Sequence, residues 1–221
     1  MRLVLLSDTH RQHDAIRVPP GDVLVHAGDF CGHGTVKQAE AFADFVVRQP
    51  HRYKVVIAGN HDRCLEMDPE LGPRLFPKER GCHYLFDSGV VLDGVRFWGS
   101  PWQPWFLDWA FNLQRGAPLR AKWDLIPSKT DVLVTHGPPH QVRDRCEDGH
   151  LAGCEELALA LQRVQPRVHV FGHIHEGYGV TRVESTLFCN ASICTLAYTP
   201  SNPPLVVDLV DGEARLVSAD A

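Results

Sequence analysis

The chain has 221 residues, of which 44% are hydrophobic, and this length predicts one substantial core in a single domain spanning residues 1–221. Its formal net charge of −5 excludes the strongly basic face on which proteins bind long nucleic acids. The seven cysteines are scattered with no Cys-x-x-Cys pair, and no apolar run is long enough for a signal peptide or a membrane span. A reduced, cytoplasmic protein without membrane contact is therefore expected.

Five short apolar runs, rich in Val and Leu, recur along the chain, and a turn rich in Gly, Asp or His follows each one. Runs of this length and composition are typical of strands buried on both faces of a sheet. In chain order they span 2–7, 22–27, 54–58, 131–135 and 167–171. The turns that follow them contain Asp8 and His10, then Asp29, then Asn60, His61 and Asp62, then His136, and finally His173 and His175.

Helical patterns lie between some of these runs. Residues 35–49 repeat apolar side chains at helical spacing, and Thr35 and Gln38 are spaced as in a capping box. Residues 154–164 show the same periodicity. Strand signals without intervening helices, for which antiparallel pairing is expected, recur at 95–99, 178–183, 186–190 and 205–210.

In open α/β sheets, ligands bind beyond the carboxyl ends of the strands. Carboxylate, imidazole and amide groups follow the five runs, and all of these groups can bind a cation. A single buried histidine is more often a core residue than a ligand, and His26 and His169, which lie inside strands, are expected to be core or supporting residues. One metal site explains the polar ends of all five runs together. If these residues are instead ordinary core or loop residues, each polar end needs a separate explanation.

These motifs resemble those of the calcineurin-like metallophosphoesterases. The matching residues are Asp8-x-His10, Gly28-Asp29, Gly59-Asn60-His61-Asp62, His136 and Gly172-His173-x-His175, in the family's order. Segments 100–106, 111–113, 135–139, 164–179 and 190–194 are similar to the metallophosphoesterase-domain-containing branch, which is linked to class III cyclic nucleotide phosphodiesterases. The resemblance implies a four-layer αββα sandwich of the α/β (α+β) class, with two mixed sheets flanked by helices.

The resemblance also implies a centre of two metal ions. It places Asp8, His10 and His175 on the first ion, places Asn60, His136 and His173 on the second, and makes Asp29 the bridge between them. Two such ions, about 3.5–4 Å apart, can generate a hydroxide nucleophile and neutralise developing charge. The mixed nitrogen and oxygen donors suit Mn, Fe, Co, Ni or Zn, and Mn²⁺ is the family's usual assay metal.

Charge favours a diester as the substrate. Two divalent ions, two aspartates and a bridging hydroxide leave about one net positive charge, which matches a phosphodiester better than a phosphomonoester. Protein phosphatases of the superfamily extend the second motif with an arginine, whereas Phe30-Cys31-Gly32-His33-Gly34 follows Asp29 here. Arg63 or the arginines of segment 143–145 remain alternatives for holding a monoester.

His61 is the residue that the resemblance assigns to proton transfer toward the leaving oxygen. Asp62 is the candidate acid that tunes His61, and capping of the turn is its alternative role. Arg63 and Tyr178 are candidate substrate contacts. The tryptophans of the chain could either stack on a base or brace the irregular loop around 100–109, and those considered are Trp102, Trp105, Trp109 and Trp123.

The predicted function is hydrolysis of small phosphodiesters, with 2′,3′- or 3′,5′-cyclic nucleotides as the expected substrates. The alternatives are a phosphomonoesterase or nucleotidase, a nuclease of the same superfamily, and a nucleotide-binding scaffold with weak activity. The expected partners are the small-molecule substrate and, from related small enzymes, a second copy in a homodimer.

Overall fold

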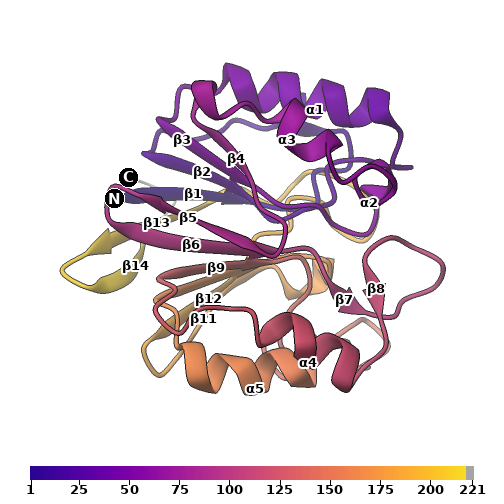
Figure 1. Ribbon diagram of the computed structural model, residues 1–221, viewed down its shortest axis with the longest axis vertical. Helices are drawn as coiled ribbons and strands as arrows, with labels where there is room; N and C mark the ends of the chain where they lie inside the picture. Colours follow the sequence, from indigo (N-terminus) through magenta and orange to yellow (C-terminus); the bar gives the residue numbers. More distant parts are fainter. Residues whose placement is uncertain (218–221) are drawn as a thin grey trace.

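Two six-stranded sheets pack face to face in the computed structural model, which describes residues 1–217 (Figure 1). The first sheet has the order β14-β13-β1-β2-β3-β4. Strands β1 to β4 are parallel, and β13 and β14 extend the sheet with antiparallel pairing. The bounds are β1 Arg2–Leu6, β2 Val23–His26, β3 Tyr53–Val56, β4 Cys82–Tyr84, β13 Leu205–Val210 and β14 Glu213–Val217.

The second sheet has the order β11-β12-β10-β9-β6-β5. Its four central strands are parallel, and the two edge strands, β11 and β5, pair antiparallel. The bounds are β5 Ser88–Leu92, β6 Val95–Ser100, β9 Val132–Thr135, β10 Val168–Phe171, β11 Gly179–Val183 and β12 Thr186–Asn190. A small ribbon of β7 (Gln103–Pro104) and β8 (Asn112–Leu113) lies outside both sheets.

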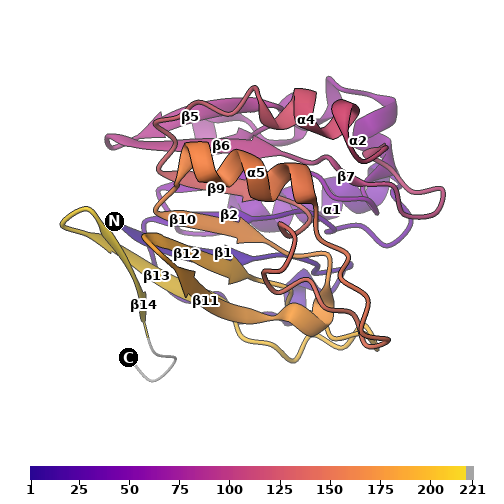
Figure 2. The same cartoon turned by 90° about the horizontal axis from the view of Figure 1, so that it is seen from below.

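Helices cover the outer face of each sheet, which completes the predicted four layers (Figures 1 and 2). Helices α1 (Val36–Arg48), α2 (Arg63–Met67) and α3 (Leu71–Leu75) lie on the first sheet, and α4 (Ala117–Trp123) and α5 (Glu155–Val164) lie on the second. Short 3₁₀ turns occur at His13–Ala15, Lys78–Arg80 and His175–Gly177. No helix within residues 1–217 is long and apolar enough to cross a bilayer.

Successive side chains along a strand point to opposite faces of its sheet, and in the central strands both faces are buried. Val55 and Ile57 lie in the core between the sheets, whereas Val56 and Ala58 pack on the helical side. Leu133 of β9 packs against the α4–α5 layer, and its neighbours in sequence face the first sheet. Continuous apolar runs therefore predicted the central strands correctly.

Two details differ from the sequence predictions. Antiparallel pairing is confirmed for β11 and β13, but β6 and β12 are antiparallel on one side and parallel on the other. The capping box of α1 is half formed. Thr35 accepts from the Gln38 backbone N–H at 3.4 Å, but the Gln38 side chain accepts from Gly32 and His33, whose N–H groups reach it as the chain approaches the helix.

His169, in β10, is a buried support for the loop that follows β9. The Thr135 hydroxyl donates to the Gly137 carbonyl at 2.8 Å, so it accepts from His169 Nε2, also at 2.8 Å. His169 Nδ1 is buried and has no hydrogen-bond partner among the described residues. Burial lowers the pKa of His169 to about 3, so the ring is neutral.

Acid is therefore expected to destabilise the fold through His169. Its folded pKa lies below its unfolded value, so the unfolded state binds a proton first and the stabilisation is lost as pH falls below about 6.5. Between that pH and pH 5 the loss is about 2 kcal/mol of unfolding free energy. Denaturant unfolding of the wild type and of His169→Gln, in chelator at pH 7 and pH 5, measures this loss of unfolding free energy. Gln is the suitable replacement because it keeps a donor for Thr135 and does not titrate. Equal pH dependence in the wild type and the variant would contradict this assignment.

Candidate metal centre

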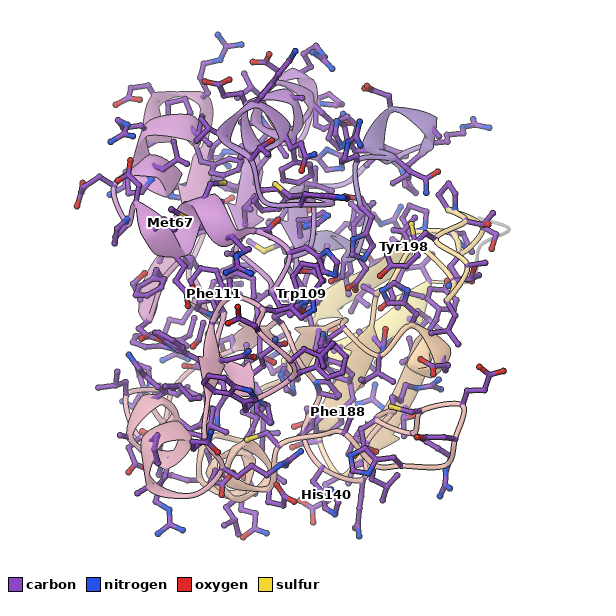
Figure 3. The ribbon with its side chains drawn as sticks, turned by 90° about the vertical axis from the view of Figure 1, so that its right-hand side faces the viewer. Met67, Trp109, Phe111, His140, Phe188 and Tyr198 are labelled. Atoms are coloured by element: carbon purple, nitrogen blue, oxygen red, sulfur yellow. The ribbon has the colours of Figure 1, made fainter. Side chains whose placement is uncertain are left out.

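The predicted ligands converge at one end of the sandwich because the parallel strands of both sheets end there. Figure 3 views this end of the molecule, with Trp109 and Tyr198 near its middle. Asp8 follows β1, Asp29 follows β2 and Asn60 follows β3 in the first sheet. His136 and His173 follow β9 and β10 in the second sheet. The site is therefore built from both sheets.

Several of these side chains lie on strained backbone. The φ angles of Asp8, His10, Asp29 and His173 are +52°, +40°, +59° and +66°, respectively. Residues with side chains occupy this left-handed region uncommonly, and such strain is concentrated at functional sites. The turns direct these side chains back across the strand ends instead of along the strands.

The first group of ligand atoms comprises Asp8, His10 and His175, and these atoms lie within 4.8 Å of one another. The Nε2 atoms of His10 and His175 are 3.3 Å apart, and His175 Nε2 is 3.5 Å from Asp8 Oδ1. The carbonyls of Cys31 and Thr195 accept from the Nδ1 atoms of His10 and His175, respectively. This bonding turns both Nε2 lone pairs toward the site, which is how metal-binding histidines are normally held.

The second group comprises Asp29, His136 and His173. His136 Nδ1 donates to the Ala27 carbonyl at 2.9 Å, and its Nε2 lies 2.9 Å from Asn60 Oδ1. Asp29 Oδ2 is 3.4 Å from His136 Nε2 and 4.0 Å from His10 Nε2. One carboxylate oxygen of Asp29 thus lies between the two groups, as a bridging ligand must.

Buried charge makes both groups suitable for cations. Burial alone would raise the pKa of Asp29, but the imidazoles of His136 and His61 hold it below its usual range. At His136 burial opposes a positive charge, yet Asp29 and Asp8 raise its pKa to about 9. Burial lowers the pKa of His173 to about 3, which keeps that imidazole neutral and able to bind a metal. The donor set fits two divalent transition-metal ions.

Two glycines leave the space that the ligands occupy. A Cβ on Gly59 would lie 2.6 Å from Cε1 of His136 and would overlap the Asp29 carboxylate. A Cβ on Gly172 would overlap Asp8 Oδ2 and the Ser7 hydroxyl. These turns therefore require glycine because side chains from other strands occupy the volume.

Gly172→Ala is expected to displace Asp8 and to destabilise the protein by about 1–3 kcal/mol, because overpacking a filled site has that cost. Binding of the first metal should be lost as well. Gly137→Ala is the matched control, since its Cβ would meet only Gln103 at 3.7 Å. Thermal unfolding and metal analysis of both variants check the expectation. A Gly172→Ala protein with wild-type stability and metal content would contradict it.

His61 lies beside the two groups with its ring held on both sides. Its Nδ1 donates to the Gly32 carbonyl at 2.8 Å, and its Nε2 is 3.9 Å from Asp29 Oδ2. Trp109 stacks on the ring with a centroid distance of 4.1 Å and an interplanar angle of 30°. His61 also forms a possible ligand group with His10 and Asp29. Geometry therefore allows His61 to act as a proton donor or as a ligand.

Within residues 1–217 no hydrogen bond joins Asp62 to His61, and the role of Asp62 as the acid that tunes this ring stays a prediction. Its carboxylate accepts from the backbone N–H groups of Asp29, Cys31 and Gly59 at 2.8–2.9 Å. Burial, followed by the Asp29 carboxylate, raises the pKa of Asp62 to about 7. These bonds join the turn after β2 to the turn after β3, and Asp62 forms no side-chain capping bond with the described residues of α2.

The two predicted substrate contacts lie outside the cleft over the metal centre. Arg63 Nη1 donates to the Asp108 carbonyl at 2.6 Å, and the Tyr178 hydroxyl donates to the Pro203 carbonyl at 2.7 Å. Tyr178 instead lines a separate pocket of about 490 Å³. Arg143, the other alternative, donates to carbonyls of the chain from Gly177 to Val180. The sequence positions of Arg63, Tyr178 and Arg143 did not indicate that backbone carbonyls, rather than a substrate, would accept their hydrogen bonds.

Two supporting residues, Ser192 and Tyr198, were not predicted from the sequence, and a third, Trp109, was predicted only to stack on a base or to brace its loop. The Ser192 hydroxyl donates to Asp8 Oδ2 at 2.8 Å, and the only sequence signal for it was the resemblance of segment 190–194. Tyr198 packs edge-on against His10 at 4.8 Å, although no motif contains it. Trp109 contacts His61, whereas Trp123, grouped with the loop tryptophans, is buried in α4.

Comparisons with known proteins agree with this geometry. A model of the calcineurin-like phosphoesterase family matches residues 1–177. Human metallophosphoesterase domain-containing protein 1 is 45% identical over 94% of this chain and 71% of its own length. A UPF0046 protein of Caenorhabditis elegans is 38% identical over 95% of this chain and 60% of its own length.

Solved structures show the same fold at low identity. The protein TT1561 of Thermus thermophilus superposes with a TM-score of 0.66 at 11% identity and covers 98% of this chain and 97% of its own. The family uses dinuclear metal centres, and the ligand groups described above supply the donors for one. The match over residues 1–177 and the 45% identity show that this chain belongs to the calcineurin-like phosphoesterase family.

Proposed function

We propose that the chain is a phosphodiesterase that uses two divalent metal ions, Mn²⁺ being the one to assay first, and hydrolyses small phosphodiesters, cyclic nucleotides among them. The observation that carries the proposal is the position of Asp29 Oδ2 between His136 and His10. That position allows one carboxylate to bridge two ions, which is the arrangement that two-metal hydrolases require. We further propose a single domain in the cytoplasm.

The charges around the cleft favour a diester. The cleft has a volume of about 390 Å³. Arg115 is the one Arg or Lys that lines it within residues 1–217, and Glu155 pairs with that arginine. Asp148 and Glu176 line the same cleft. A phosphomonoester carries nearly two negative charges. No unpaired Arg or Lys among the described lining residues balances the second charge, so only the metal ions would balance it.

The chain's own residues supply binding, orientation and proton transfer. When bound, the two ions activate water and neutralise charge on the phosphate oxygens. Asn60 and the ligand imidazoles fix the position of the phosphate relative to the His61 ring. His61 donates its Nδ1–H to the Gly32 carbonyl, and in its doubly protonated form it would give the proton on Nε2 to the leaving oxygen and become neutral. Asp62 holds the Asp29 and Gly59 backbone in place during this reaction.

Three other functions are distinguishable from this one. A phosphomonoesterase or nucleotidase would prefer the dianionic ester, a nuclease would cleave polynucleotides, and a scaffold would bind nucleotides without turnover. The acidic cleft disfavours the first two. The intact ligand set, which a binding scaffold does not need, disfavours the third. A homodimer remains part of the proposal.

Hydrolysis of bis(p-nitrophenyl) phosphate against p-nitrophenyl phosphate tests the proposal. We expect the diester to be preferred in Mn²⁺, activity to vanish in chelator, and His173→Ala to lower kcat/KM by at least about 100-fold, equivalent to about 2.7 kcal/mol. His33→Ala, at an exposed histidine before α1, is the matched control. Preference for the monoester would overturn the substrate assignment, and metal-independent cleavage would overturn the mechanism.

A further inference from the structure

The cleft over the metal centre has a polar floor and an apolar wall. The floor is formed by ligand residues and His61. The wall is formed by Pro104, Trp105, Phe106, Leu196 and Tyr198, which lie on two loops far apart in sequence. The side chains of Trp105, Phe106 and Tyr198 are exposed by 57%, 49% and 49%. So large an exposed aromatic surface beside a polar centre is typical of a ligand-binding surface.

The two inner rings of this wall contact opposite halves of the metal centre. Phe106 lies edge-on to His173, with centroids 5.8 Å apart. Tyr198 lies edge-on to His10 at 4.8 Å and to His175 at 5.7 Å. A phosphate held between the two ligand groups would therefore have one ring beside each half. The substituent of that phosphate would extend along the aromatic wall.

The loop that carries Phe106 is held by hydrogen bonds within the chain. The Asn112 side chain donates to the carbonyls of Phe106, Leu107 and Trp109 at 3.0–3.1 Å and accepts from the Phe106 N–H at 3.2 Å. The Ala110 N–H donates to the Asn60 carbonyl at 3.1 Å, which ties the loop directly to a ligand residue. Preorganisation of this kind reduces the ordering cost of binding.

The charge of the surrounding groups restricts the substituent. Asp148 and Glu176 line the same cleft and repel a second anionic group. Arg115 is bound by Glu155 and by the carbonyls of Ala152 and Gly153, so its guanidinium is already neutralised. An uncharged, planar and apolar group satisfies the wall, because aromatic pairs stack or meet edge-to-face with additional stabilisation.

We propose that the cleft contains a subsite, bounded by Phe106 and Tyr198, that binds an uncharged aromatic substituent on the phosphate ester. Phe106 and Tyr198 are thus the residues that select, among the small diesters of the proposed function, those with a planar aromatic group. This inference rests on the metal centre of the proposed function for the position of the phosphate.

Monomethyl phenylphosphonate and monomethyl methylphosphonate, called phenylphosphonate and methylphosphonate below, provide the test. Both carry one negative charge, as the proposed substrate does, they differ in one substituent, and they cannot be hydrolysed at the C–P bond. Calorimetry with Mn²⁺-loaded protein should show phenylphosphonate binding about tenfold more tightly, as an aromatic contact and its buried area together predict. Phe106→Ala and Tyr198→Ala should each reduce this ratio to about threefold or less. The ratio is compared within each variant, because Phe106 and Tyr198 pack against metal-ligand histidines and their removal also affects the affinity for methylphosphonate.

Two further variants serve as controls. Leu107→Ala changes an exposed residue of the same loop that does not line the cleft, and it should keep the wild-type ratio. Phe106→Tyr retains a ring and should restore selectivity. Equal affinity for the two phosphonates, failure of both to bind, or a ratio that both alanine variants leave unchanged would overturn the subsite.

The same protein assayed with bis(p-nitrophenyl) phosphate separates the two proposals. Selective phenylphosphonate binding without diester hydrolysis would remove the proposed function and support the subsite. Diester hydrolysis without phosphonate selectivity would remove the subsite and leave the function intact.

Discussion

Asp29→Asn is expected to lower kcat/KM for a phosphodiester by at least about 1000-fold, equivalent to about 4 kcal/mol of transition-state stabilisation. Asp29 Oδ1 accepts from the His61 N–H at 2.7 Å, and Oδ2 faces both ligand groups. An amide in this position removes the negative charge that two adjacent cations require. It also turns an NH₂ group either toward the His61 N–H or toward the imidazoles of His136 and His10.

Metal analysis should accompany the kinetics. The Asp29→Asn protein is expected to retain fewer than two Mn²⁺ per chain and to remain folded, because the side-chain volume is nearly unchanged. Asp44→Asn, the same chemical change at an exposed position of α1, should leave both activity and metal content at wild-type levels. An Asp29→Asn enzyme with two bound ions and normal turnover would show that Asp29 is not the bridge.

His61→Ala is expected to lower kcat by about 100- to 10,000-fold, the usual contribution of a general acid. The loss should depend on the leaving group. An ester with an alkyl leaving group needs a proton as its bond breaks, whereas p-nitrophenolate leaves without one, so the variant should impair alkyl esters far more. Rates for a series of diesters with leaving groups of increasing basicity measure this dependence.

The metal content of His61→Ala decides between the two roles that the geometry allows. A proton donor can be removed with both ions retained, whereas a ligand cannot. His83→Ala, at a histidine of β4 outside the cleft, is the control. Loss of one ion together with a uniform loss for all leaving groups would identify His61 as a ligand and contradict its assignment as an acid.

The central strands and the convergence of polar strand ends could be predicted because both depend on local pattern. A short run rich in Val and Leu, such as 131–135, is typical of a strand in a sheet covered on both faces. Parallel strands of one sheet end at the same edge, so Asp8 and Asp29 were expected to meet. His136 joins them from the second sheet, 128 positions from Asp8, and only the family resemblance implied that. Thr35 at the start of α1 was equally local.

The rest depended on contacts between segments that are distant in sequence. Asp62 follows His61 directly, yet its carboxylate bonds backbone groups 3 to 33 positions away. Tyr178 follows the last motif by only three positions, but its hydroxyl donates to the carbonyl of Pro203, which comes after β11 and β12 in the chain. Tyr198, which does line the cleft, is brought there by a loop without a recognisable motif. Tertiary packing decided these positions.

Anomalous diffraction from crystals of the protein grown with Mn²⁺ tests the two-ion centre most directly. We expect two peaks about 3.5–4 Å apart, as in two-metal hydrolases. Both peaks should lie within bonding distance of the Asp29 carboxylate, one beside Asp8 and His175 and the other beside His136 and His173. A single peak, or two peaks that do not share Asp29, would contradict the central claim.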